Sequence, residues 1–243
     1  MRPRALRFLS TADGERALQT LQKLARHDIS GWALTGGLAV ELHRIRLGCE
    51  PAVRPLNDLD FVVGSFDAIP ATLEDDVLFR HVHPLAAPGK LLLQLIDPES
   101  ALRVDVFRSS GGTMDRTLPV AARDVAARLV SLEDLIARTA RILLDLESGI
   151  PTPAKYVCDY VRLSELVEPS QVDPAWRDQR KPSQPDTFDE AAALLERLIP
   201  SRTGLLISPQ YSKDVEEVCP RCTATDAFPL ADARLVLSLL GYC

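Results

Sequence analysis

The chain has 243 residues, of which 46% are hydrophobic and 26% charged, as in ordinary folded globular proteins. Acidic residues outnumber basic ones, 34 to 28, and the net charge of -6 argues against a general basic surface for nucleic acid. The sequence has no apolar run of the roughly 20 residues that cross a bilayer and no leader-like N-terminal segment, so we expect a cytoplasmic protein without membrane contact. Its five cysteines, an odd number, do not form a secreted disulfide framework.

Helical and strand patterns alternate through about the first 110 residues, because apolar positions recur either at helical spacing or in short buried runs. The expected elements, in chain order, are a helix at 14–28, a strand at 31–35, a helix at 38–48, a strand at 58–64, and an antiparallel hairpin of strands at 90–97 and 102–109. This order predicts an α/β (α+β) domain with a mixed sheet.

The rest of the chain has mainly helical patterns. Ser131, with Asp134 three residues later, predicts the N-terminal cap of a long helix. Further helices are expected at 154–167, 189–199 and 231–241. We therefore predict an α/β domain at 1–120 and a helical region at 121–243, with a Pro-rich loop near 168–187 that lacks periodicity.

Three aspartates lie in strands that are otherwise apolar. Asp58 and Asp60 are one residue apart and therefore point to the same face of their strand. Like charges repel there, and burying either carboxylate alone is costly. A divalent cation such as Mg²⁺ would relieve this repulsion, and Asp105 on a neighbouring strand would supply the third carboxylate of a two-metal site.

The Gly36–Gly37 step stands at the start of a helix. Two glycines let backbone N–H groups approach a phosphate closely, at the positive end of the helix dipole. Alone, each feature has a simpler explanation, since a DxD pair is usually a solvated strand face and a Gly-Gly step a tight turn. Their order and spacing together favour a nucleotide and metal site.

Two cysteines, Cys219 and Cys222, have the spacing of zinc ligands. A structural zinc site needs four ligands, and the sequence has no second such pair and no nearby histidine. We expect these cysteines to be small residues of a loop. His81 and His83 alternate on one strand, and we expect them on an exposed face.

The order strand, Gly-Gly, helix, DLD strand and a later single Asp in a strand resembles the nucleotidyltransferase superfamily, the polymerase-beta-like fold. TGGLAVELHRI followed by DLDFVV, and SLEDLIARTARILLDL followed by AKYVCDYVRLSEL, resemble its branch of AbiEii-type toxins and uncharacterised relatives. The resemblance covers roughly 29–167. It implies a catalytic domain followed by a helical region.

The resemblance also implies an activity, the transfer of a nucleoside monophosphate from an NTP to an acceptor, with two Mg²⁺ ions or Mn²⁺ in their place. Asp58, Asp60 and Asp105 match the family's catalytic and metal-binding carboxylates, and Gly36 and Gly37 its triphosphate-binding glycines. Further nucleotide-binding residues are expected to be Arg54, Arg138 and Arg141, the last two in place of a family lysine whose position Thr139 occupies.

The partners expected are an NTP and an acceptor, which is a small molecule, a protein or a tRNA. The toxin branch adds a cognate antitoxin. The rival hypothesis is a catalytically inactive nucleotide-binding or protein-interaction module of the same fold. The absent lysine favours this rival, and the intact set of Asp58, Asp60 and Asp105 opposes it.

Overall fold

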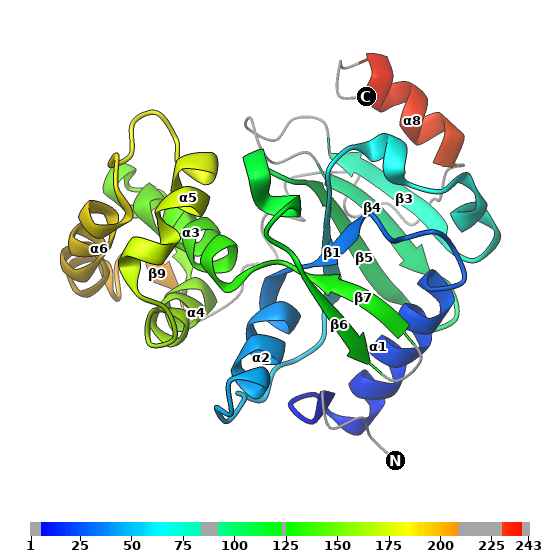
Figure 1. The fold of residues 1–243 in the computed structure, drawn as a ribbon, viewed down its shortest axis with the longest axis horizontal. Helices are drawn as coiled ribbons and strands as arrows, with labels where there is room; N and C mark the ends of the chain where they lie inside the picture. The colour runs from blue at the N-terminus through cyan, green and yellow to red at the C-terminus, as the bar shows by residue number, and fades with distance from the viewer. Residues whose placement is uncertain (1–5, 84–91, 123–124, 209–229, 240–243) are drawn as a thin grey trace. The chain divides into compact units, whose positions relative to one another are not determined.

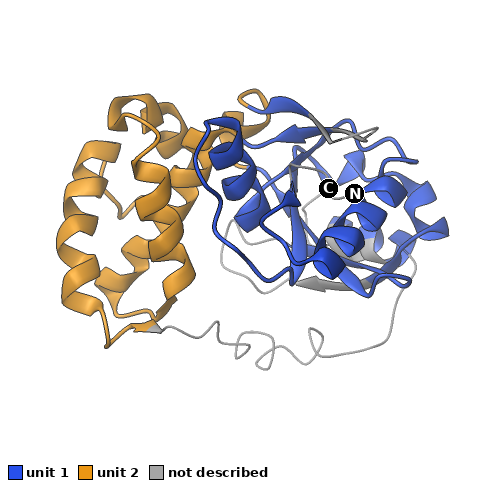
Figure 2. Ribbon diagram, turned by 90° about the horizontal axis from the view of Figure 1, so that it is seen from below, with its two compact units in different colours: residues 1–109, 117–130, 219–243 blue, residues 110–116, 131–218 orange. Residues whose placement is uncertain are grey.

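The computed structural model describes residues 6–83, 92–122, 125–208 and 230–239. These residues form two compact units (Figure 2). The first holds the described residues up to Ser109, the segment Thr117–Val130 and the C-terminal helix α8 (Leu230–Leu239). The second holds Ser110–Arg116 and the described residues from 131 to 208.

The first unit is built on a seven-stranded mixed sheet in the order β3-β4-β5-β2-β1-β7-β6 (Figure 1). Its strands are β1 (Trp32–Leu34), β2 (Asp58–Val63), β3 (Leu78–His83), β4 (Leu92–Asp97), β5 (Leu102–Arg108), β6 (Leu118–Ala122) and β7 (Val125–Leu129). Two pairs, β2 with β5 and β1 with β7, are parallel, and the others are antiparallel. The predicted mixed α/β class and the hairpin of β4 and β5 are confirmed.

Alternation along the central strands separates a core face from a polar face. Leu59, Phe61 and Val63 of β2 are buried, as are Val104 and Val106 of β5. Trp32 of β1 is buried too and packs edge-on against Phe61, with ring centroids 5.4 Å apart. The residues between them on β2 and β5, which include the aspartates, point to the other face.

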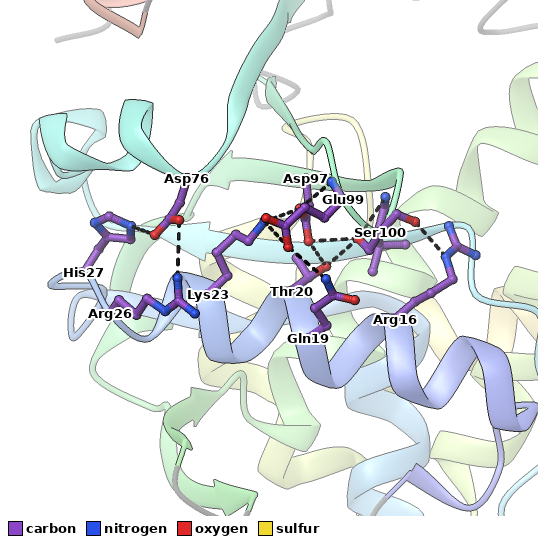
Figure 3. A network of polar contacts seen from close by, with 11 residues as sticks. Arg16, Gln19, Thr20, Lys23, Arg26, His27, Asp76, Asp97, Glu99 and Ser100 are labelled. Carbon is purple, nitrogen blue, oxygen red and sulfur yellow. Dashed lines mark hydrogen bonds and ion pairs between the residues drawn. The ribbon is translucent and has the colours of Figure 1, made fainter.

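Helix α1 (Thr11–Leu24) is joined to the hairpin turn by a buried polar network (Figure 3). The Lys23 ammonium lies 2.7 Å from Asp97 Oδ1, and both side chains are almost completely buried. Thr20 and Ser100 donate to Asp97 Oδ2 at 2.8 and 2.9 Å. Because every polar group of this cluster has a partner, the network fixes the position of α1 instead of destabilising the core.

The second unit is helical. Its helices are α3 (Leu132–Leu143), α4 (Ala154–Ser164), α5 (Pro169–Gln179) and α6 (Phe188–Arg202), with a short parallel pair of β8 (Thr152–Pro153) and β9 (Ile207–Ser208). Ser131 accepts a hydrogen bond from Asp134 N and caps α3, as the sequence predicts. Trp176 of α5 is fully buried against Phe188 of α6, with ring centroids 5.9 Å apart.

Two sequence predictions about this half of the chain need correction. The Pro-rich segment near 168–187 is not a loop throughout, because it contains α5. Pro169 stands at the first helical position, where its missing N–H costs nothing, and Glu168 and Gln171 form a capping box. The boundary at 120/121 cuts through β6, because short Ala-rich strands carry little periodic signal and β6 and β7 complete the sheet.

Other predictions fall outside what can be described. Cys219 and Cys222 lie outside the described residues, and the side chains of His81 and His83 are likewise not described. Among the helices of the described ranges, none combines the length and the apolar character needed to cross a bilayer.

Candidate functional site

The parallel pairing of β2 with β5 brings the three predicted carboxylates together. Its register places Asp60 beside Asp105 and Asp58 beside Arg103. Neighbouring strands lie about 4.8 Å apart, so side chains in register on one face are in contact range. Asp58 and Asp60 are partly exposed, whereas Asp105 is only 4% exposed.

The three carboxylates have the spacing of a metal site. One oxygen from each of Asp58, Asp60 and Asp105 lies within 4.8 Å of the others. Oxygens on opposite sides of a Mg²⁺ ion lie about 4 Å apart, and carboxylate oxygens are the protein ligands that this ion prefers. Asp105 Oδ1 is also buried and accepts no hydrogen bond from any residue that the structure describes. The donor set and this oxygen fit a divalent cation.

Electrostatics around Asp105 are dominated by its burial, which raises the pKa of this carboxyl group well above its ordinary range. Arg103 lowers the pKa, the neighbouring Asp60 and Asp58 raise it further, and a hydrogen bond with Gln94 lowers it. A cation beside Asp105 would favour its ionised form. The carboxylate cluster is therefore costly to charge unless positive charge is close.

Gly36 begins helix α2 (Gly36–Arg46) directly beneath Asp60. Its φ of +67° is in the left-handed region, and an added Cβ would lie 1.9 Å from Asp60 Oδ2. The N-cap residue Thr35 does not cap the helix with its side chain, and the first turn holds no acidic residue. The N-terminus of α2 and the Asp60 carboxylate thus meet where only glycine fits.

Arg54 lies over the second glycine of the step. A Cβ on Gly37 would lie 3.0 Å from Arg54 Nη1. The Arg54 Nε donates to Glu41 Oε1 at 2.5 Å, and Glu41 Oε2 accepts from Ala52 N at 2.9 Å. Glu41 is fully buried on α2, so it holds the guanidinium at the first turn of the same helix.

Six predicted residues therefore come together in the first unit, namely Gly36, Gly37, Arg54, Asp58, Asp60 and Asp105. The sequence prediction missed Arg103, Gln94 and Glu41. Arg103 could have been found, because it stands two residues before Asp105 and shares its strand face. Gln94 depends on the hairpin register and Glu41 on a contact thirteen residues away, so neither had a local signal.

Arg138 and Arg141 lie on α3, in the second unit. Arg141 donates to Gln179 O at 3.5 Å, and burial followed by the nearby Arg138 charge lowers its pKa. Thr139 donates to Leu135 O at 2.8 Å and so bonds within its own helix. A role of Arg138 and Arg141 at the triphosphate stays a prediction.

Two solved structures are distant likenesses of the chain. No family model and no curated protein matches the chain. An antigenic nucleotidyltransferase-like protein from Paracoccidioides brasiliensis is 18% identical with a TM-score of 0.45, covering 82% of this chain and 94% of its own. JHP933 from Helicobacter pylori is 15% identical with a TM-score of 0.39, covering 96% and 95%. At these values neither likeness carries an argument about function.

Proposed function

We propose that the chain is a metal-dependent nucleotidyltransferase that moves a nucleoside monophosphate from an NTP to an acceptor. The observation that carries the proposal is the register of β2 and β5, which assembles Asp58, Asp60 and Asp105. The N-terminus of α2 adjoins this cluster through the contact of Gly36 with Asp60. A carboxylate cluster beside an anion-binding helix end is what a magnesium-triphosphate complex requires.

Each residue has a task that its position supports. Asp58 and Asp60 would hold the divalent cation, which supplies charge neutralisation at the reacting phosphate. The backbone of Gly36 and Gly37 would donate to the triphosphate, and Arg54 would neutralise its charge. Asp105, the most buried of the carboxylates, would complete the cation site and take the proton of the acceptor hydroxyl.

The direct test is calorimetric binding of each NTP with Mg²⁺ to the wild type and to an Asp58→Asn/Asp60→Asn variant. We expect micromolar binding of at least one NTP that needs Mg²⁺ and is lost in the variant, because the ligands of the cation are removed. Asp67→Asn, an exposed aspartate of the same unit, is the matched control and should bind as the wild type does. The absence of binding for every NTP would overturn the proposal.

Glu41→Gln tests whether the buried carboxylate positions Arg54. We expect the Kd for the magnesium-NTP complex to rise about tenfold, because the guanidinium loses its fixed charged partner. Arg54→Ala should raise the Kd by a similar factor. The Kd of the Glu41→Gln/Arg54→Ala double variant should be only slightly higher than that of either single variant. Glu15→Gln, on an exposed part of α1, is the control. An unchanged Kd in Glu41→Gln beside a weakened Arg54→Ala would assign Glu41 a structural role only.

A second candidate is an inactive nucleotide-binding or protein-interaction module. The observation that favours it is Arg103, whose guanidinium pairs with both Asp58 and Asp105. In this case the wild type would bind an NTP but release no pyrophosphate with any acceptor. A radiolabelled α-phosphate offered with RNA, protein and small-molecule fractions separates the two candidates.

The same labelling experiment addresses the acceptor, which we propose to be a small molecule, a protein or a tRNA. Label in the RNA fraction would support a tRNA-like acceptor, and label in the protein fraction a hydroxyl side chain. A cognate antitoxin would be supported by a neighbouring small gene whose product suppresses the labelling.

A further inference from the structure

Arg103 places a positive charge inside the carboxylate cluster. It stands on β5 two residues before Asp105 and beside Asp58 in the β2–β5 register. Its Nη2 pairs with Asp58 Oδ2, and its Nε lies 3.1 Å from Asp105 Oδ1. The side chain is only 14% exposed, so the guanidinium is largely held within the site.

The guanidinium and a divalent cation would use the same acidic groups. Asp58 and Asp105, with which Arg103 pairs, are two of the three carboxylates with metal-site spacing. Carboxylates this close repel one another in a poorly solvated site, and the Arg103 guanidinium offsets part of that repulsion. In the absence of a metal ion, Arg103 is therefore a counter-charge to Asp58 and Asp105.

Two buried oxygen atoms next to the Arg103 pairing, Asp105 Oδ1 and Gln94 Oε1, have no hydrogen-bond partner among the described residues. Asp105 Oδ1 is buried and lies near the Arg103 Nε, but it accepts no hydrogen bond from the described part of the chain. Gln94, which pairs with Asp105 in the β4–β5 register, is 2% exposed, and its Oε1 also has no hydrogen-bond partner within the described ranges. Two buried acceptor oxygens beside one carboxylate cluster suit a cation that coordinates oxygens directly.

We propose that Arg103 is a built-in counter-cation of the Asp58/Asp60/Asp105 cluster, which a divalent cation must displace in order to bind. This inference rests on the proposed function, because it needs the cluster to be a metal site. The displaced guanidinium remains a positive charge beside the cluster, available to the negative charge of the bound triphosphate. Metal affinity is thus set by competition as well as by the ligands.

The test measures binding of Mn²⁺ alone to the full chain. The electron paramagnetic resonance signal of the free ion reports how much Mn²⁺ stays unbound. We expect Arg103→Gln to bind Mn²⁺ at least tenfold more tightly than the wild type, because the competing charge is gone. Arg103→Lys, which keeps the charge without the two-pronged geometry, should lie between them. Arg108→Gln is the matched control, since Arg108 is exposed on the same strand and on its opposite face.

Thermal unfolding of the same variants provides a second readout. Without metal, Arg103→Gln should melt below the wild type, because Asp58 and Asp105 lose their ion pairs with Arg103. With saturating Mn²⁺ it should gain more in Tm than the wild type gains. Arg108→Gln should follow the wild type in both conditions.

The outcomes separate this inference from the proposed function. Equal or weaker Mn²⁺ binding in Arg103→Gln, with binding still abolished by Asp60→Asn, would overturn the role of Arg103 and leave the metal site intact. Mn²⁺ binding by Arg103→Gln but not by the wild type would support the inference most directly. No Mn²⁺ binding by any variant would overturn the metal-dependent function itself.

Discussion

Replacing Asp105 by Asn is expected to lower nucleotidyl transfer about 10³-fold while magnesium-NTP binding changes by less than about threefold. Under the proposed function, Asp58 and Asp60 would still hold the cation with the triphosphate, so binding would be largely kept. The amide cannot take a proton from the acceptor hydroxyl and carries no charge for the cation site. The rate of pyrophosphate release, at saturating NTP and with the fraction that accepts label in the labelling experiment, measures nucleotidyl transfer. Calorimetry measures the binding of the magnesium-NTP complex.

The division between turnover and binding distinguishes Asp105 from its neighbours. Asp58→Asn and Asp60→Asn should weaken binding and turnover together, because each removes a cation ligand of the proposed function. Asp67→Asn, which is exposed and lies in the same unit, should change neither. If Asp105→Asn retained wild-type turnover, the buried aspartate would be only a structural part of β5. If it lost NTP binding fully, its main role would be to hold the cation.

The site was predictable from the sequence where it depends on local pattern. Alternation along β2 places Asp58 and Asp60 on one face, and the Gly36–Gly37 step marks the start of α2, where the contact with Asp60 excludes any side chain. The shared strand face of Asp58 and Asp60 follows from their separation of two residues in the sequence. That Asp105 lies beside them was inferred only from the chemistry of the set.

The remaining parts depend on pairings that no local pattern encodes. The parallel register of β2 and β5 sets Arg103 against Asp58, and the hairpin register sets Gln94 against Asp105. Helix α5 was missed because proline usually marks loops, yet Pro169 occupies the first helical turn, which tolerates it, and Pro174 lies inside the helix. In each case a tertiary contact, such as the burial of Trp176, overrides the local signal.

The largest loss of stability is expected for Lys23→Met, which leaves Asp97 buried without its cationic partner. Removing one member of a buried pair costs about 3–5 kcal/mol. Lys23→Met/Asp97→Asn should be less destabilised than Lys23→Met alone, because no uncompensated charge remains. Arg7→Met, which breaks an exposed pair with Glu50, should cost less than about 1 kcal/mol.

Urea unfolding in a Trp176→Phe background measures these changes in the first unit. Trp32 is then the one tryptophan left, and it lies in the core of that unit. The double variant serves as the check on mechanism. If it were as unstable as Lys23→Met, lost packing of the lysine stem, and not an unpaired charge, would explain the cost.

The pH dependence of stability gives an independent measure of the same pair. Burial alone would raise the pKa of Asp97, but hydrogen bonds from Lys23, Thr20 and Ser100 outweigh it and lower the pKa to about 2. Because the folded pKa lies below the ordinary value of 3.8, the stabilisation is complete above that value and is lost as the pH falls toward 2. The loss should reach about 2 kcal/mol in the wild type and be smaller in Lys23→Met, whose Asp97 loses the largest of the hydrogen-bond contributions that lower its pKa. Equal acid sensitivity in both proteins would show that Lys23 is not what keeps Asp97 ionised.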